Sequence, residues 1–339
     1  MHYVGIDLAN RTSAVCVVDE RGNVVRQDGI KTDRSDLEAL MNRLDYGRVL
    51  VEASPLAEWV AETVETCGHE AEIVEPRAAK KLAEVQKKTD PRDARTLAQL
   101  ARSGFYTAVH RKSERARLQR SQIQARQGLV DTERAMTNRI RGLLRAHGIV
   151  LGQVSKGQFV EKARTKARDY VPELLPFLEP LFAILEGARE SAKQLKKGIE
   201  NQQKQDSVAM RLQTVPGVGP LVTQTFQATL DDPDRFSNGD EVADYLGLSP
   251  GIYQSGEMEA RGAITKAGDN LVRWHLVEAA HVLLYLGPDC ALKRWGQRLA
   301  ENKGSGKARV AMARKLAVLL WRLWRKGDTF QPFPQTQAA

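Results

Sequence analysis

The stretch YVGID (residues 3–7) decides the fold of the first third of the chain, because it is a short apolar run that ends on an acid. A second apolar run, AVCVV (14–18), follows, and the turn DERGN (19–23) leads into VVR (24–26). Apolar runs of this length, separated by turn residues, are typical of β-strands. The pattern predicts two or three adjacent antiparallel strands at the start of the protein.

Helical stretches enter next and alternate with further strands. The stretch 35–44 leads into RVLVE (48–52), and the stretch 56–67 leads into AEIVE (71–75). Strands that alternate with helices form sheets covered by helices. We therefore expect an α/β domain with a mixed sheet.

The middle of the chain is helical and very polar. Arginine is dense over residues 111–145, with apolar residues at spacings near three, four and seven, and a similar stretch covers 182–210. Such spacings predict long amphipathic helices that form an extended arm or a partial coiled coil. The segment 150–180 carries no pattern that assigns it.

The last third restarts at a glycine-rich turn, VPGVGP (215–220), and ends in a basic amphipathic stretch at 307–326. A chain of 339 residues suggests two or three domains. We predict an α/β domain at 1–110, an arginine-rich helical linker at 111–205 and a mostly helical domain at 206–339.

The charge of the chain favours a polyanionic partner. Its 51 Lys and Arg residues against 42 Asp and Glu give a formal net charge of +9. Neutralising phosphates releases condensed counterions, which draws a basic protein toward nucleic acid.

The three cysteines are far apart and show no C-x-x-C spacing, which indicates a reducing compartment and disfavours a zinc site. The sequence carries no basic and then apolar leader, and no run approaches the length of a membrane span. We expect a cytoplasmic protein with no membrane partner.

Four acids stand at the ends of predicted elements. Asp7 and Glu52 each end a strand. Pro91 suits the first turn of a predicted helix, Asp90 then suits its N-cap, and Asp93 follows three residues later. If the two strands are neighbours, Asp7 and Glu52 project from one edge of the sheet, where ligands of open α/β sheets bind. A step of three residues brings Asp93 round to the same side as Asp90.

Converging carboxylates repel one another unless a cation lies between them, and oxygen ligands favour Mg²⁺ or Mn²⁺. Two such ions, roughly 4 Å apart, hold a scissile phosphate in many nucleases. Any one of these acids alone is explained more simply, as a strand-end cap, an arginine partner or a helix start. The ordered set favours a metal site.

The last third offers candidates for contacts with nucleic acid. Gly217 and Gly219 lie in a turn that resembles a helix-hairpin-helix, a motif that binds phosphate through backbone amides, and the alternative is an ordinary helix connection. Ser255 precedes a glycine and is the candidate nucleophile, with a turn or cap residue as the alternative. Arg261 and Lys266 are candidates for steadying the phosphate, unless they belong to a solvated basic loop.

The first group of motifs resembles a known family. YVGID (3–7), VEAS (51–54) and TDPRDA (89–94) resemble the Asp-Glu-Asp-Asp set of the insertion-sequence-110 transposase family, whose N-terminal domain is similar to RuvC Holliday-junction resolvases. The resemblance implies a ribonuclease-H/RuvC-like fold for residues 1–110. It also implies that the magnesium ligands are Asp7, Glu52, Asp90 and Asp93.

The second group resembles the C-terminal transposase domain of the same family. It comprises YQSG (253–256), RG (261–262) and TKAG (265–268), and the matching serine of the family is a covalent nucleophile, which implies that role for Ser255. The sequence departs from the family after the proline of GLSP (247–250), where Gly251 and Ile252 replace a common basic residue.

The resemblance implies a DNA transposase or site-specific recombinase that cleaves and rejoins strands through a phosphoserine. It implies double-stranded donor and target DNA, a structured non-coding guide RNA bound by the arginine-rich helices and the basic tail, a homo-oligomer (dimer or tetramer) and work at the nucleoid. Two alternatives are a RuvC-like metal-dependent endonuclease or junction resolvase in which water attacks, and a non-catalytic nucleic-acid-binding protein.

Overall fold

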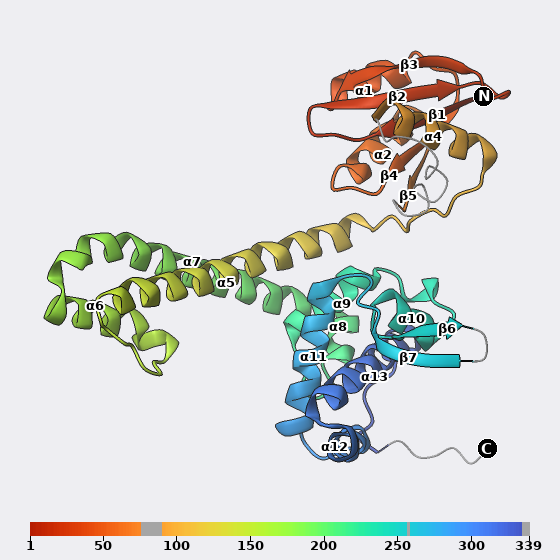
Figure 1. The fold of residues 1–339 in the computed structure, drawn as a ribbon. Helices are drawn as coiled ribbons and strands as arrows, with labels where there is room; N and C mark the ends of the chain where they lie inside the picture. The colour runs from red at the N-terminus through yellow and green to blue at the C-terminus, as the bar shows by residue number, and fades with distance from the viewer. Residues whose placement is uncertain (76–89, 256–257, 334–339) are drawn as a thin grey trace. The chain divides into compact units, whose positions relative to one another are not determined.

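The computed structural model describes residues 1–75, 90–255 and 258–333, with the side chains of 90–91 and 252–261 outside that description. The chain forms two compact units, Met1–Arg111 and Lys112–Ala339 (Figure 1). The second unit contains both the arm and the C-terminal part, each with its own apolar cluster. The division into three domains at 110 and 205 stays a prediction.

The first unit is built on a five-stranded sheet in the order β3-β2-β1-β4-β5. β1 pairs antiparallel with β2 and parallel with β4, while β2–β3 is antiparallel and β4–β5 parallel. The predicted mixed sheet is therefore confirmed. The strands are β1 (His2–Asp7), β2 (Thr12–Val18), β3 (Val24–Lys31), β4 (Gly47–Glu52) and β5 (Glu70–Val74).

Helices cover both faces of this sheet, because the central strands carry apolar side chains on both sides. Val4 and Ile6 of β1 pack against α1 (Arg34–Met41) and α2 (Ala57–Thr66) on one face. Leu50 of β4 packs against α4 (Asp90–Ser103) on the other. Two-sided burial of this kind is typical of strands in the middle of an α/β sheet.

Gly5 allows α4 to lie directly on β1. A Cβ atom at Gly5 would lie 2.0 Å from the carbonyl oxygen of Ala94 and 2.7 Å from Cβ of Leu97. Farther along α4, the Gln99 amide donates to the carbonyl of Gly22 at 2.8 Å, in the turn beside the beginning of β1. The helix therefore runs antiparallel to β1, and its first turn lies at the edge where β1 ends.

The arm of the second unit is built around two long helices that lie side by side (Figure 1). The segment that the sequence left unassigned forms two short 3₁₀ turns and α6, and it closes an apolar cluster with Ile140, Leu144 and Phe182. The helices of the arm are α5 (Glu114–Ala146), α6 (Phe159–Tyr170) and α7 (Leu175–Lys204).

The remainder of the second unit is a bundle of helices around Phe226, Leu276 and Leu316, and a two-stranded hairpin projects from it. In the described part of the chain no helix is both long and apolar enough to span a membrane. The elements are α8 (Ser207–Leu212), α9 (Pro220–Leu230), α10 (Gly239–Tyr245), β6 (Pro250–Ser255), β7 (Met258–Ile264), α11 (Asn270–Tyr285), α12 (Ala291–Lys303) and α13 (Ser305–Lys326).

Candidate active site

The strand register places Asp7 opposite Glu52. In the parallel pair of β1 and β4, Ile6 aligns with Val51, so the next residue of each strand, which is also its last, is an acid. Gly5 and Leu50 both face α4. Because side chains alternate along a strand, Asp7 and Glu52 project on that same face of the sheet.

The start of α4 lies at this edge as well. Asp90 is the first residue of the helix, and Asp93 precedes Ala94, whose carbonyl oxygen faces Gly5. The side chain of Asp93 is partly exposed, as are those of Asp7 and Glu52. The side chain of Asp90, and with it the expected N-cap, lies outside the described residues.

The described side chains contain no group of three His, Cys, Asp or Glu residues arranged to hold a metal ion, and Asp90 is not among them. The backbone brings the ends of β1 and β4 and the start of α4 to one edge of the sheet, and each of these three segments carries at least one acid. An all-carboxylate donor set suits a hard divalent cation better than a soft one.

Two glycine-containing segments, 247–250 and 265–268, pack closely against each other at the base of the β6–β7 hairpin. A Cβ atom on Gly247 would lie 2.0 Å from the carbonyl oxygen of Ala267, and one on Gly268 would lie 2.2 Å from that of Tyr245. Both glycines have positive φ values, 66° and 73°. The Gly-Leu-Ser-Pro and Thr-Lys-Ala-Gly runs are thus partners in one turn structure, for which glycine is needed at both positions.

Arg273 fastens this base, a role that the sequence did not reveal. Arg273 as a whole is 8% exposed, and its guanidinium donates to the carbonyls of Leu246 at 3.2 Å and Ala267 at 2.5 Å. These carbonyls belong to the segments that enter and leave the hairpin. A single buried cation therefore joins both ends of the element that carries Ser255.

Ser255 is the last residue of β6 and aligns with Met258, which places it at the tip of the hairpin. Arg261 aligns with Ile252 nearer the base, and Lys266 follows β7 in a left-handed conformation with φ of 56°. At about 3.3 Å per residue, the strand separates Lys266 from Ser255 by roughly 20 Å. The register does not bring these two residues together within one hairpin.

The Pro-Gly-Val-Gly turn connects α8 to α9 and packs on α11. Gly217 has a φ of 86°, and a Cβ there would lie 2.6 Å from the carbonyl oxygen of Ala279. Packing therefore accounts for Gly217. Gly219 is the N-cap of α9, and no atom lies within 4 Å of the position of its missing Cβ. Phosphate binding by this turn stays a prediction.

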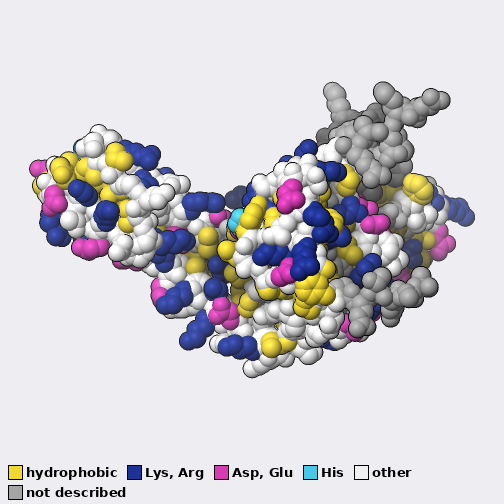
Figure 2. Space-filling model, turned by 90° about the horizontal axis from the view of Figure 1, so that it is seen from below, with side chains coloured by type: hydrophobic (Ala, Val, Ile, Leu, Met, Phe, Trp, Pro, Cys, Tyr) yellow, Lys and Arg dark blue, Asp and Glu magenta, His cyan; other side chains and the backbone are white. Residues whose placement is uncertain are grey.

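The arginines of α5 fall into two groups, those with contacts inside the arm and those exposed at its surface. Arg141 donates to the carbonyl of Leu151 at 2.5 Å and lies over the ring of Phe159, so it holds the arm together. Arg139 and Arg145 are exposed and have no ion-pair partner among the described residues. On the face shown in Figure 2, lysines and arginines are spread over the arm at the left and over the bundle, with acids between them.

Two protein-family models match this chain. The model of the DEDD transposases of the IS110 type matches residues 4–149, and the model described as Transposase IS116/IS110/IS902 family matches residues 209–292. The first range contains all four acids of the sheet edge and the second contains Ser255. A domain of the DEDD type implies dependence on a divalent metal.

Full-length relatives agree with the two models. The chain is 26% identical over 333 residues to the transposase for insertion sequence element IS1111A of Coxiella burnetii, covering 97% of this chain and 91% of the relative. It is 23% identical over 339 residues to the transposase for IS1328 of Yersinia enterocolitica, covering 96% and 98%. This chain belongs to the IS116/IS110/IS902 family of transposases, and it is an enzyme that recombines DNA.

Proposed function

We propose that this transposase cleaves and rejoins the DNA of its insertion sequence through a phosphoserine formed at Ser255. Magnesium, or manganese in its place, is held by the acids of the sheet edge. The proposed ligands are Asp7, Glu52, Asp90 and Asp93.

The observation that carries the proposal is the alignment of Asp7 with Glu52 on the face covered by α4. Strands β1 and β4 end there together, and the helix that carries Asp90 and Asp93 begins there. When bound, divalent cations neutralise the carboxylates and stabilise negative charge on a phosphate. The acids would hold those cations in place, and through the cations they would orient the phosphate relative to the attacking group.

The hairpin supports the role of Ser255, because Arg273 and two closely packed glycines hold its base and Ser255 lies at its tip. In the proposed step Ser255 Oγ gives up its proton and forms a bond to phosphorus. The bond from phosphorus to one sugar oxygen breaks, and that oxygen leaves as a hydroxyl after taking up a proton. A hydroxyl of a second strand then reverses the step, so the energy of the phosphodiester is conserved without ATP.

The proposal also includes a guide RNA that binds to the arm. Exposed arginines on the arm, such as Arg139 and Arg145, suit the phosphates of a structured RNA encoded by the element. Pairing of that RNA with donor and target DNA then chooses the sites, and the protein recognises backbone and shape. We propose that the protein acts in the cytoplasm, at the nucleoid, as a dimer or tetramer.

The test is covalent trapping on DNA that carries the ends of the element, in the presence of its flanking non-coding RNA and Mg²⁺. The intact chain should become attached to labelled DNA, and Ser255→Ala should give no attachment. Ser237→Ala is the matched control, because Ser237 is an exposed serine of the same unit whose side chain makes no hydrogen bond among the described residues.

The outcomes separate the alternatives. Cleavage without attached protein would show that water attacks, as in a metal-dependent nuclease or junction resolvase. Binding without cleavage in any condition would indicate a nucleic-acid-binding protein. Omission of the RNA should abolish product formation, and equal product without it would remove the guide from the proposal.

A second experiment tests the proposed metal site at the edge of the sheet. Asp7→Asn should abolish attachment, as should chelation of divalent ions, and readdition of Mg²⁺ should restore the activity of the unaltered chain alone. Asp45→Asn serves as the control, because Asp45 is an exposed acid in the loop before β4. Full activity of Asp7→Asn would refute the assignment of the metal site.

A further inference from the structure

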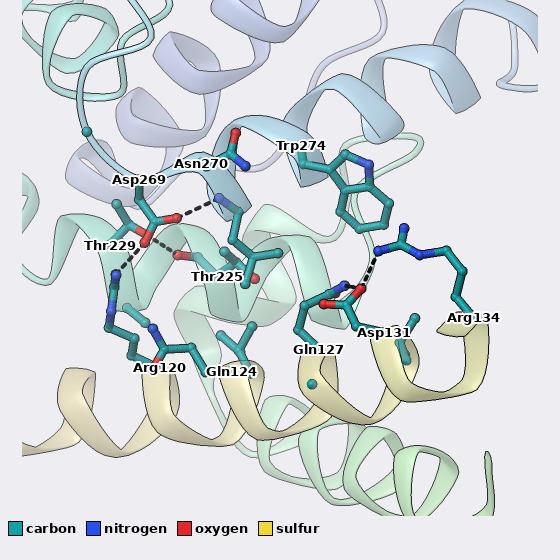
Figure 3. Close-up of a pocket in the computed structure, with 16 residues that line it drawn as sticks. Arg120, Gln124, Gln127, Asp131, Arg134, Thr225, Thr229, Asp269, Asn270 and Trp274 are labelled. Carbon is teal, nitrogen blue, oxygen red and sulfur yellow. Dashed lines mark hydrogen bonds and ion pairs between the residues drawn. The ribbon is translucent and has the colours of Figure 1, made fainter. Parts of the chain in front are cut away.

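A pocket of about 850 Å³ lies between three helices of the second unit (Figure 3). The middle of α5 forms one wall, the end of α9 forms the floor and the start of α11 forms the opposite wall. Its volume is in the range of sites that hold small molecules. The polar and aromatic lining includes Arg120, Gln124, Gln127, Arg134, Asn270 and Trp274.

The charges of the pocket are already paired. Asp269 accepts from the backbone N–H of Leu271 at 2.6 Å and forms an ion pair with Arg120. Asp131 accepts from Arg134 at 2.7 Å and from Gln127 at 3.1 Å. A ligand that relies on charge alone, such as a free phosphate, would therefore have to break these pairs.

Trp274 is the second feature of the pocket. The residue is 50% exposed, although it belongs to a helix whose neighbouring positions are buried in the bundle. The indole lies at one end of the pocket in Figure 3, and its ring centroid is 5.0 Å from that of the buried His275. An exposed indole with a supported position is a surface on which a flat ring can stack.

Two amides complete the lining. The side-chain amides of Gln124 and Asn270 are exposed and make no hydrogen bond to another described residue. An amide offers a donor and an acceptor together, which matches the edge of a nucleobase. Between them the floor is formed by apolar groups, including Ala228, and by Thr225, whose hydroxyl already contacts Leu221 and His275.

We propose that this pocket takes up one unpaired nucleobase, stacked on Trp274 and hydrogen-bonded at its edge by Gln124 and Asn270. An aromatic face beside unpaired amides favours a base over a bare phosphate, and it is accessible only to a base that has left its helix. The inference rests on the proposed function to the extent that the ligand is nucleic acid.

The test uses single-stranded oligonucleotides that contain 2-aminopurine, whose fluorescence falls when it stacks on an indole. The full-length Ser255→Ala chain is used as the parent, so that binding is measured without chemistry. Trp274→Ala should weaken binding about tenfold and remove the quenching, because loss of one stacked base costs about that much affinity. Trp274→Phe should retain most of the affinity.

Tyr285→Ala is the matched control. Tyr285 is on the same helix, is 48% exposed and does not line the pocket, so its removal should leave affinity and quenching unchanged. Gln124→Leu should weaken binding severalfold in a chain that folds normally. The salt dependence of binding should be the same in all of these chains, because stacking and amide contacts release no counterions.

Parallel measurements with RNA and DNA oligonucleotides of the same sequence show which nucleic acid supplies the base. Stronger quenching of 2-aminopurine with either of them supports the pocket. Equal affinity and quenching in Trp274→Ala and its parent would overturn the inference, as would equal losses in Trp274→Ala and Tyr285→Ala. Failure of the proposed chemistry leaves this result unaffected, because no covalent step occurs. Absence of any binding by the parent would overturn this inference, whereas the covalent chemistry is judged by the trapping assay alone.

Discussion

At the scale of single residues, Gly5 determines how closely α4 approaches the sheet. A methyl group at this position would lie 2.0 Å from the oxygen of Ala94 and 2.4 Å from the amide nitrogen of Ala98, and backbone atoms cannot rotate away. We expect Gly5→Ala to lower the free energy of unfolding of the first unit by about 3 kcal/mol. DNA cleavage should be lost with it, because α4 carries Asp90 and Asp93.

Denaturant titration and the trapping assay measure these two effects. Gly142→Ala is the control, because Gly142 is exposed near the C-terminal end of α5 and a methyl group added there would meet no atom within 4 Å. At that position alanine should be neutral or stabilise by up to about 1 kcal/mol, as in other helix interiors. Equal stability of the two variants would contradict the close packing of α4.

His275 makes the stability of the second unit depend on pH. Burial, and secondly the charge of Arg126, lower the pKa of His275 from its ordinary 6.5 to about 4, against the opposing influence of Asp269. Its Nδ1 shares a hydrogen bond of 2.8 Å with Thr225 Oγ1, and its Nε2 has no partner among the described residues. The folded protein therefore keeps this imidazole neutral.

Between pH 6.5 and 4 the unfolded chain binds a proton at this histidine that the folded chain does not. The free energy of unfolding should thus fall as the pH falls through this window, by up to about 1.4 kcal/mol per pH unit. His275→Gln removes this contribution. Denaturation at pH 7, 6 and 5 should show a smaller acid loss in the variant, and identical pH dependence would refute the prediction.

At the scale of elements, Arg273 positions the hairpin that carries Ser255. Arg273→Met removes both hydrogen bonds at the hairpin base and leaves the carbonyls of Leu246 and Ala267 without that donor. Displacement of a reacting group by about 1 Å can lower a rate roughly 100-fold. We expect a loss of that order in the rate of covalent attachment.

DNA affinity should change little in the same variant, which separates positioning from binding. Arg273→Lys should recover part of the rate, because an ammonium can donate to one of the two carbonyls but lacks the guanidinium fork. A rate in Arg273→Met equal to that of the unaltered chain would show that the glycine contacts alone fix the hairpin.

The sequence predicted those elements whose burial leaves a pattern. β1, β2 and β4 were predicted because Val15, Val49 and their neighbours form apolar runs. β3 continues to Lys31, beyond the predicted VVR run, because it is an edge strand with mostly exposed side chains. The β6–β7 hairpin was missed for the same reason, since a mixed run such as MEARGAI has no period.

The gathering of acids at one edge of the sheet was predictable, because Asp7 and Glu52 each end a strand and the helix with Asp90 and Asp93 begins there. The adjacency of β1 and β4 was assumed, since no local pattern specifies which strands pair, and the structure provides it. Arg273 was not predicted, because an arginine in a helix is usually exposed, and its burial depends on carbonyls from two distant turns. Contacts of this kind exist only after folding.

At the scale of the whole molecule, each apolar cluster draws its described residues from one unit. The clusters around Val4, Leu50 and Cys16 belong to the first unit, and those around Phe226 and Ile140 belong to the second. Units with separate cores unfold separately unless a large apolar interface couples them. We therefore expect calorimetry of the full chain to show two transitions.

The variants assign those transitions. Gly5→Ala should lower the Tm of one transition by several degrees and leave the other in place, because the packing it disturbs is confined to the first unit. Gly217→Ala should do the reverse, since its added methyl meets Ala279 in the second unit. A single transition that moves equally with either substitution would mean that the two cores melt as one, and the chain would then have to be treated as one cooperative domain.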